Sequence, residues 1–216
     1  ALTVALFGIL RPGDVMLSVT GKPYDTLDQV IGLEEGDGSL KEFGVAYDQV
    51  DFTAQGGIDF DAIKAKLNCK VKMVYIQKSK GYQARPTLTG EQIGEICRFV
   101  KERKSDVCVM VDNCYGEFVD TIEPLDLGAD LIVGSLIKNL GGGIAPNGAY
   151  VAGRHDLVEL AGERLTCPGE GREVGPSLGI NKMILQGIYM APSVVAAALK
   201  TAVLTVLNFQ KLKKYF

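Results

Sequence analysis

Short, nearly unbroken apolar runs separated by amphipathic segments constrain the fold of this chain more than any other feature. A strand with one solvent-exposed face alternates polar and apolar residues. This alternation is absent from three runs, Val71–Ile76, Val107–Val111 and Asp130–Val133. Strands covered on both faces have this pattern, which is typical of parallel sheets. Thr89–Lys101 is an amphipathic helix between two of the runs. The alternation predicts a doubly wound α/β fold, with a mainly parallel sheet between two helical layers.

Weaker signals complete the predicted order of elements. Further strands are expected at residues 15–19, 44–50 and 148–152, and further helices at 59–67, 156–165 and 181–212. Asp59 is placed to cap its helix, and Pro192 is expected to interrupt the last one. We expect Met183, Leu185, Ile188 and Met190 to be core or subunit-contact residues. The chain opens at Ala1 inside a helical pattern without a capping residue, so we expect the natural protein to extend upstream.

Composition excludes several classes of partner. The net charge is −3 with scattered basic residues, so no nucleic-acid partner is expected. The richest apolar run, Val194–Leu207, is broken by Lys200 and two threonines, which predicts a helix packed on a core and no membrane span. The five cysteines include no CxxC pair and His155 is the only histidine, so we expect no metal site. Reduced thiols of this kind favour a cytoplasmic location.

Polar residues follow the buried runs at the strand ends, where doubly wound sheets bind ligands. Asp112 closes one run, and Ser135 and Lys138 follow the next, with three glycines at residues 141–143. Ser79 follows the run Val71–Ile76. Each residue alone has an ordinary interpretation: a turn-forming aspartate, a solvated lysine or a glycine loop. Together they favour a functional site.

A lysine of this kind can anchor pyridoxal phosphate. Burial beside cationic groups lowers the pKa of a lysine and frees its amine for a Schiff base with the cofactor. The cofactor then acts as an electron sink, provided that a carboxylate keeps its ring nitrogen protonated. Asp112 is placed to do so, and the Ser135 hydroxyl could donate to the cofactor phosphate. We therefore predict a pyridoxal-phosphate site at Lys138.

Nearly the whole chain resembles the fold type I, aspartate-aminotransferase-like pyridoxal-phosphate enzymes. It is most similar to the methionine gamma-lyase-like family of cysteine and methionine metabolism, whose aluminium resistance proteins are proposed carbon–sulfur lyases. The stretches that carry the resemblance are residues 5–14, 20–26, 111–118, 128–139 and 165–169. The resemblance implies that residues 1–216 form a cofactor-binding large domain, without the N-terminal segment and the C-terminal small domain of the family.

The same resemblance assigns roles to individual residues. Lys138 would carry the Schiff base and shuttle protons, Asp112 would pair with the pyridinium nitrogen, and Ser135 would contact the phosphate. Tyr24 would stack on the ring or assist the leaving group, and Asn113 would touch the edge of the cofactor. Ser79 would end a strand on the hydroxyl side of the ring. The implied reaction is elimination of a thiol from a small sulfur-containing amino acid, by a homodimer or homotetramer.

Some alternatives remain open at this stage. Transamination or aldol cleavage could use the same scaffold, and an inactive fragment could keep the fold. A nucleotide-binding α/β module is weakly supported, because neither a dinucleotide fingerprint nor a P-loop motif is present. Tyr115 and Glu117 could line the site or only hold its loop. Cys114 is expected to be a small buried residue, although its place beside Asp112 also suggests a nucleophile.

Overall fold

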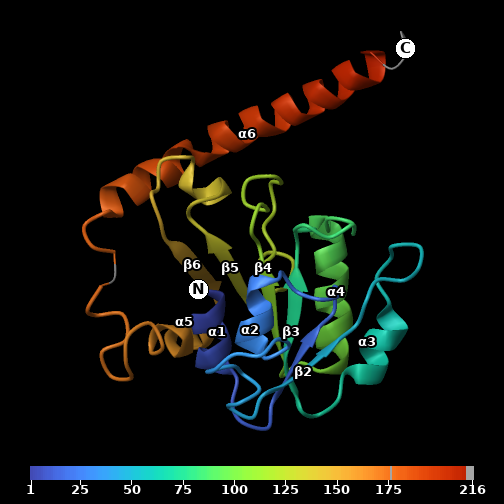
Figure 1. Cartoon of the computed structure of the whole chain (residues 1–216), viewed down its shortest axis with the longest axis vertical. Coiled ribbons are helices and arrows are strands. Elements are labelled where there is room, and N and C mark those ends of the chain that lie inside the picture. Colours follow the sequence, from blue (N-terminus) through green and yellow to red (C-terminus); the bar gives the residue numbers. More distant parts are fainter. Residues whose placement is uncertain (176, 213–216) are drawn as a thin grey trace.

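The computed structural model describes residues 1–175 and 177–212, whose strands form one six-stranded sheet between two layers of helices (Figure 1). The strands are β1 Val15–Ser18, β2 Ala46–Gln49, β3 Val71–Gln77, β4 Cys108–Asp112, β5 Leu131–Ser135 and β6 Ala149–Gly153. The helices are α1 Leu2–Ile9, α2 Thr26–Ile31, α3 Phe60–Lys66, α4 Gly90–Arg103, α5 His155–Gly162 and α6 Asn181–Leu212, with a short 3-10 helix η1 at Asn139–Gly141. Helix α2 was not predicted from the sequence.

Local side-chain contacts fix the starts of two helices. The carboxylate of Asp59 accepts a hydrogen bond from the Ala62 amide at 2.8 Å, which caps α3 as predicted. At α4, Thr89 and Gln92 cap each other's backbone amides in a complete capping box. Helix α4 thereby begins beside the segment that follows β3.

The sheet order β2-β1-β3-β4-β5-β6 places a topological switch point between β1 and β3. Neighbouring strands are parallel from β2 to β5, and β6 is antiparallel to β5. Asp112 is in register with Gln77 of β3 and with Val133 of β5. The segments that follow β1, β3, β4 and β5 therefore meet at one edge of the sheet.

Apolar side chains fill the space on both faces of the sheet. One cluster joins the sheet to α3 and α4 through Ile63, Ile93 and Val100. The other joins it to α1, α2 and α5, with Leu6 and Leu157 among its buried members. These two cores confirm the predicted three-layer α/β/α fold with a mainly parallel sheet.

Helix α6 corrects three of our expectations. It is continuous through Pro192 and extends well beyond the sheet (Figure 1). Residues 181–210 are long and apolar enough to cross a membrane, by length and composition alone, and only 11% of the most apolar window is buried. The run Val194–Leu207 is thus not packed on a core: Val203 and Leu204 are 58% and 60% exposed. Met183, Leu185 and Met190 are also exposed, so they are not core residues.

The first half of α6 is held by a close backbone approach to η1. A Cβ atom on Gly187 would lie 2.3 Å from the carbonyl oxygen of Gly141, and one on Gly142 would lie 2.3 Å from that of Gly187. No larger residue fits at this contact without displacing backbone. Since η1 directly follows Lys138, α6 is packed against the loop that carries this lysine.

Candidate active site

Asp112 is held at the end of β4 by two neighbours. Its Oδ1 accepts a hydrogen bond from the Cys114 amide at 3.1 Å, and its Oδ2 accepts one from the Tyr75 hydroxyl at 3.2 Å. The side chain is 5% exposed. A carboxylate oxygen can accept more than one hydrogen bond, so Asp112 keeps capacity for a further donor.

Lys138 lies after β5, and its ammonium group is 4.6 Å from the centroid of the Tyr115 ring. Burial favours a lower pKa for Lys138, but Cys114, Tyr115 and Asp112 outweigh it and raise the pKa. Burial raises the pKa of the Cys114 thiol to about 12, with the Asp112 charge adding to the effect. At neutral pH the thiol is therefore protonated.

Tyr24, Ser79 and Ser135 lie on the neighbouring strand ends. A hydrogen bond with Tyr82, followed by burial, raises the pKa of Tyr24, and the Tyr24 amide donates to the side chain of Gln77, the last residue of β3, at 2.7 Å. Ser135 ends β5, and its hydroxyl accepts a 3.4 Å hydrogen bond from the Ile137 amide. Ser79 follows β3 and is partly exposed. The structure thus gathers Lys138, Asp112, Tyr24 and Ser135 at one edge, with Ser79 one strand away from Asp112.

Asn113 faces a different set of groups. It is fully buried, and its amide nitrogen donates to Glu123 at 2.9 Å and to the Tyr150 hydroxyl at 3.4 Å. Tyr150 in turn donates to Glu117 at 2.8 Å, and the backbone carbonyl of Glu117 accepts from Asn139 at 3.1 Å. This buried network ties the loop after β4 to the loop of Lys138.

The network resolves the alternatives for the two neighbouring residues. Tyr115 contacts the Lys138 ammonium, so it lines the site. Glu117 is 3% exposed and holds the loop instead. Burial is the main cause of the raised pKa of Glu117, to which the charges of Glu123 and Asp112 add.

Three supporting residues were missed by sequence reasoning. Tyr75, inside an apolar run, fixes Asp112 through its hydroxyl. The side chain of Gln77 accepts from the Tyr24 amide at 2.7 Å and donates to the Ser79 carbonyl at 3.0 Å. Arg85 donates to the carbonyls of Thr20 and Ser79 and so joins the segments after β1 and β3. The only feature of the sequence that could have indicated these three residues is a polar group at the end of a side chain within an apolar strand or just after it.

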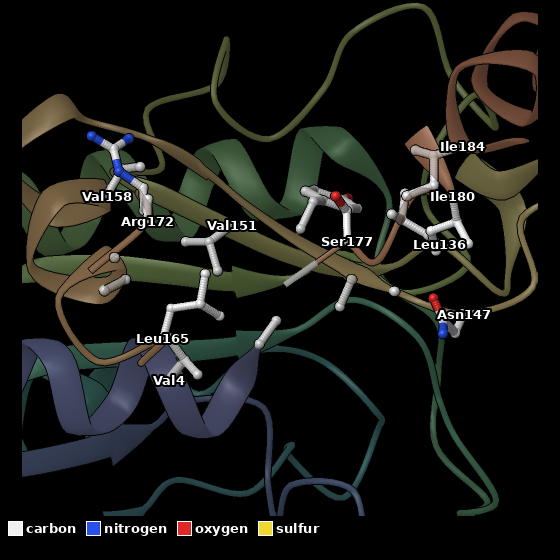
Figure 2. Close-up of a pocket in the computed structure, with 16 residues that line it drawn as sticks. Val4, Leu136, Asn147, Val151, Val158, Leu165, Arg172, Ser177, Ile180 and Ile184 are labelled. Carbon is white, nitrogen blue, oxygen red and sulfur yellow. The ribbon is translucent and has the colours of Figure 1, made fainter. Parts of the chain in front are cut away.

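Two cavities of similar size lie near this edge. One, of about 480 Å³, is lined by apolar side chains of α1, β6, α5 and the start of α6, including Val4, Val151 and Ile184 (Figure 2). None of the predicted site residues lines it. The other, of about 510 Å³, is lined by Ser79, Cys114 and Tyr115. The second cavity therefore adjoins the Lys138 site.

The donor set at this edge fits pyridoxal phosphate. A carboxylate with spare acceptor capacity, an amine, aromatic rings and a serine hydroxyl are present at the ends of adjacent strands. The raised pKa of Lys138 means that the amine must lose a proton before it can form a covalent bond. Fold and site together define a class: α/β proteins with a lysine and a buried carboxylate at the carboxyl edge of a mainly parallel sheet.

Comparison with known proteins narrows that class. Residues 1–215 match the methionine gamma-lyase family, and the chain belongs to it. The uncharacterized protein YnbB of Bacillus subtilis is 50% identical over 214 residues, which cover 98% of this chain and 51% of YnbB. L-methionine gamma-lyase of Pseudomonas putida is 30% identical over 163 residues, which cover 74% of this chain and 35% of that enzyme.

Solved structures agree. A candidate cystathionine beta-lyase involved in aluminum resistance, from Listeria monocytogenes, has a TM-score of 0.91 and 51% identity, covering 93% of this chain and 50% of the other. A carbon–sulfur lyase involved in aluminum resistance, from Clostridium novyi, has a TM-score of 0.90 and 50% identity. The match covers 94% of this chain and 49% of that lyase. The resemblance found in the sequence is confirmed. The chain spans about half the length of YnbB and of these two structures.

Proposed function

We propose that residues 1–216 serve as the pyridoxal-phosphate-binding domain of a carbon–sulfur lyase that acts on a small sulfur-containing amino acid. The observation that carries the proposal is the Lys138 ammonium, 4.6 Å from the Tyr115 ring centroid, in the loop after β5, whose neighbouring strand β4 ends at the buried Asp112. Membership of the methionine gamma-lyase family supports the choice of lyase over transamination or aldol cleavage.

The residues of this chain would divide the chemistry as follows. Bound pyridoxal phosphate supplies an electron-withdrawing ring. Lys138 would hold the cofactor through its amine and, once the substrate amine has displaced it, the free amine would take the proton from the α-carbon of the substrate. Asp112, oriented by Tyr75, would keep a proton on the ring nitrogen. Ser135 would bind the phosphate, and Ser79 is a further proposed cofactor contact, whereas Asn113 is fully buried and holds Glu123 and Tyr150 instead.

Release of the thiol balances as an elimination. The carbon–sulfur bond breaks, sulfur keeps both bonding electrons, and Tyr24 donates the proton that completes the thiol. Water then converts the remaining fragment to a 2-oxo acid and ammonia. Tyr24 is suited to this role because its amide is bound by Gln77, which is in register with Asp112 on the neighbouring strand.

The first test is the absorbance spectrum of the purified protein with added pyridoxal phosphate, before and after borohydride. We expect a visible band that borohydride abolishes, and peptide mapping should place the reduced adduct on Lys138. Lys138→Ala should lose the band, while Lys64→Ala, which changes a lysine of α3, should keep it. A protein without the band, or with the adduct elsewhere, contradicts the cofactor proposal.

The second test separates the reaction types. The cofactor-loaded protein should release thiol, ammonia and a 2-oxo acid in equal amounts from an S-alkyl cysteine. A 2-oxo acid without thiol would indicate transamination, and glycine with an aldehyde from a hydroxyamino acid would indicate aldol cleavage. If the cofactor binds but no product forms, the chain is an inactive fragment of such an enzyme.

We also propose that the protein is a cytoplasmic homodimer or homotetramer. All five cysteines are free, as suits a reducing compartment. The exposed apolar face of α6 supports a second copy as its partner, because contiguous apolar surface of this kind marks association sites. We propose no nucleic-acid or membrane partner.

A further inference from the structure

The loop after β4 contains two residues in a strained backbone conformation. Tyr115 and Phe118 have φ angles of 65° and 58°, in the left-handed region that favours glycine. Bulky aromatic residues remain in this region only where surrounding contacts hold them there. The ring centroid of Tyr115 lies 4.6 Å from the Lys138 ammonium group. The contacts that hold the loop therefore also hold the neighbour of the reactive lysine.

Glu117 lies in this strained stretch and supplies such contacts. Its Oε1 atom accepts a hydrogen bond from the Tyr150 hydroxyl of β6 at 2.8 Å. Its backbone carbonyl accepts a hydrogen bond at 3.1 Å from the side chain of Asn139, the residue after Lys138. The packing is close, because a Cβ atom on Gly134 of β5 would lie 2.5 Å from Glu117 Oε1. Glu117 thus joins the strained loop to the sheet and to the loop of Lys138.

The Glu117 carboxyl group is poorly placed to carry a charge. It is 3% exposed, and its Oε2 atom has no hydrogen-bond partner among the residues that the structure describes. In the same described part of the chain, Asn113 Oδ1, an acceptor of the same network, has no donor. A buried carboxylate needs donors or a cation, whereas a neutral acid has a hydroxyl group that it can donate. The two unpartnered oxygens therefore favour a proton on Glu117.

The charged groups around Glu117 favour the neutral acid as well. Burial, followed by the charges of Glu123 in the same loop and Asp112 of β4, raises the pKa of Glu117. From the segment after β3, Lys78 packs its methylene chain on Gly116, where an added Cβ would lie 2.6 Å from Lys78 Cδ. Across residues 1–175 and 177–212, no lysine or arginine forms an ion pair with Glu117 or Glu123. Ionised Glu117 would therefore add a negative charge beside two carboxylates.

We propose that Glu117 positions Lys138 for capture of the cofactor, and that it does so as a neutral carboxylic acid. The inference rests on the proposed function and adds to it a positioning residue whose effect depends on pH. Ionisation of Glu117 would release the strained loop, withdraw the Tyr115 ring from the lysine and leave the amine without a fixed position.

The test is the pH dependence of cofactor affinity in the wild type and in Glu117→Gln. Glutamine is neutral at every pH, and its side-chain oxygen can still accept from Tyr150. The pKa of Glu117 is raised while the loop is held, so this stabilisation is lost as the pH rises above about 4.5, the ordinary value. The Kd for pyridoxal phosphate, read from the visible band, should be similar in the two proteins near about pH 5. At higher pH the wild type should bind more weakly than Glu117→Gln, by about tenfold for a pKa raised by one unit.

Two further variants separate positioning from packing. Glu117→Ala removes the carboxyl group and its contacts, so it should weaken cofactor binding at every pH. Glu91→Gln, at an exposed position of α4, should follow the wild type throughout. A ratio of the wild-type Kd to the Glu117→Gln Kd that does not change with pH would overturn the inference, as would Glu117→Gln binding as weakly as Glu117→Ala. If Glu117→Ala does not fold, the pH dependence of that ratio decides the matter.

A separate measurement distinguishes this inference from the proposed function. If the wild type gives no visible band with pyridoxal phosphate, the cofactor proposal fails, and competitive acetylation of Lys138 with acetic anhydride judges the positioning alone. Mass spectrometry should show that, as the pH rises, Lys138 reacts faster in the wild type than in Glu117→Gln, because ionised Glu117 frees the amine from Tyr115. Equal acetylation of Lys138 in the two proteins at every pH would overturn the inference.

Discussion

At the scale of single residues, buried hydroxyl and carboxyl groups hold the geometry of the site. Asp112 and Lys138 each reach their position through contacts that the strand pattern alone does not reveal. Tyr75 fixes the carboxylate, and Gln77 fixes the Tyr24 segment. The parallel sheet brings the reactive groups together, and these supporting residues orient them.

Removal of the Tyr75 hydroxyl should be costly. Tyr75→Phe leaves Asp112 Oδ2 without its buried donor, so we expect the free energy of unfolding to fall by about 1.5–3 kcal/mol, the range for hydrogen bonds to charged groups. Tyr47→Phe is the control, because its half-buried hydroxyl donates to a neutral amide oxygen of Gln49. Urea unfolding should show a smaller loss of unfolding free energy for Tyr47→Phe than for Tyr75→Phe. Equal losses would mean that the hydrogen bond to Asp112 stabilises the fold no more than the hydrogen bond to Gln49.

Glu117 should make stability depend on pH. Its pKa is raised in the folded protein, so the folded state binds the proton more tightly than the unfolded chain. The stability that this provides is lost as the pH rises above about 4.5, the ordinary value. Glu117→Gln cannot ionise, so its stability relative to wild type should increase from about pH 4.5 toward neutrality.

Urea unfolding at several pH values measures this difference. Glu91→Gln, at an exposed position in the first turn of α4, is the control and should not become more stable with rising pH. A flat difference for Glu117→Gln would show that the pKa of Glu117 is the same in the folded and unfolded states.

At the scale of elements, the structure agrees with the sequence where burial dictates the pattern. The strands β3, β4 and β5 were predicted from continuous apolar runs, because both of their faces are covered. Helix α2 was missed because its six residues are too few to show helical periodicity. The exposure of α6 could not be predicted, since an apolar helix has the same composition whether its partner is its own core or another surface.

The contact between α6 and η1 should not tolerate a side chain. Gly187→Ala would place a methyl group 2.3 Å from the Gly141 carbonyl oxygen, so we expect a loss of about 1–3 kcal/mol in unfolding free energy. Gly94→Ala in α4 is the matched control, because its methyl group meets only ordinary contacts with Leu127 at 3.5 Å. The control should gain up to about 1 kcal/mol from helix propensity. If the unfolding free energy changed in the same direction in Gly187→Ala and Gly94→Ala, the close backbone approach between α6 and η1 would be contradicted.

At the scale of the whole molecule, the predicted layers and the meeting of strand ends both follow from the doubly wound topology. Sheets of this topology bind ligands at their carboxyl edge. Asp112, Ser135 and Lys138 were predicted from their places after strands, and the structure brings them to that edge. Asn113 illustrates the limit of such reasoning, because adjacent residues of a loop can face opposite ways. Its amide is directed toward Glu123 and Tyr150.

The apolar face of α6 should drive association. Val203→Glu combined with Leu207→Glu places charges on exposed positions of the helix, so we expect the assembly to dissociate to monomers without loss of secondary structure. Light scattering after size exclusion measures the mass. Lys64→Glu on α3 is the control and should leave the mass unchanged. Flotation of the wild type with lipid vesicles would instead identify a membrane as the partner of α6.

The arrangement of strand ends also has a consequence for how the chain folds. The groups proposed to bind the cofactor come from segments between residues 24 and 138, and parallel pairings join every strand from β2 to β5. Parallel pairings close long loops, and chains that depend on them fold slowly. Tyr24, Ser79, Asp112 and Lys138 can meet only after the last of those pairings has formed. The time course with which refolding protein becomes able to capture pyridoxal phosphate would therefore follow completion of the sheet, later than the formation of its helices.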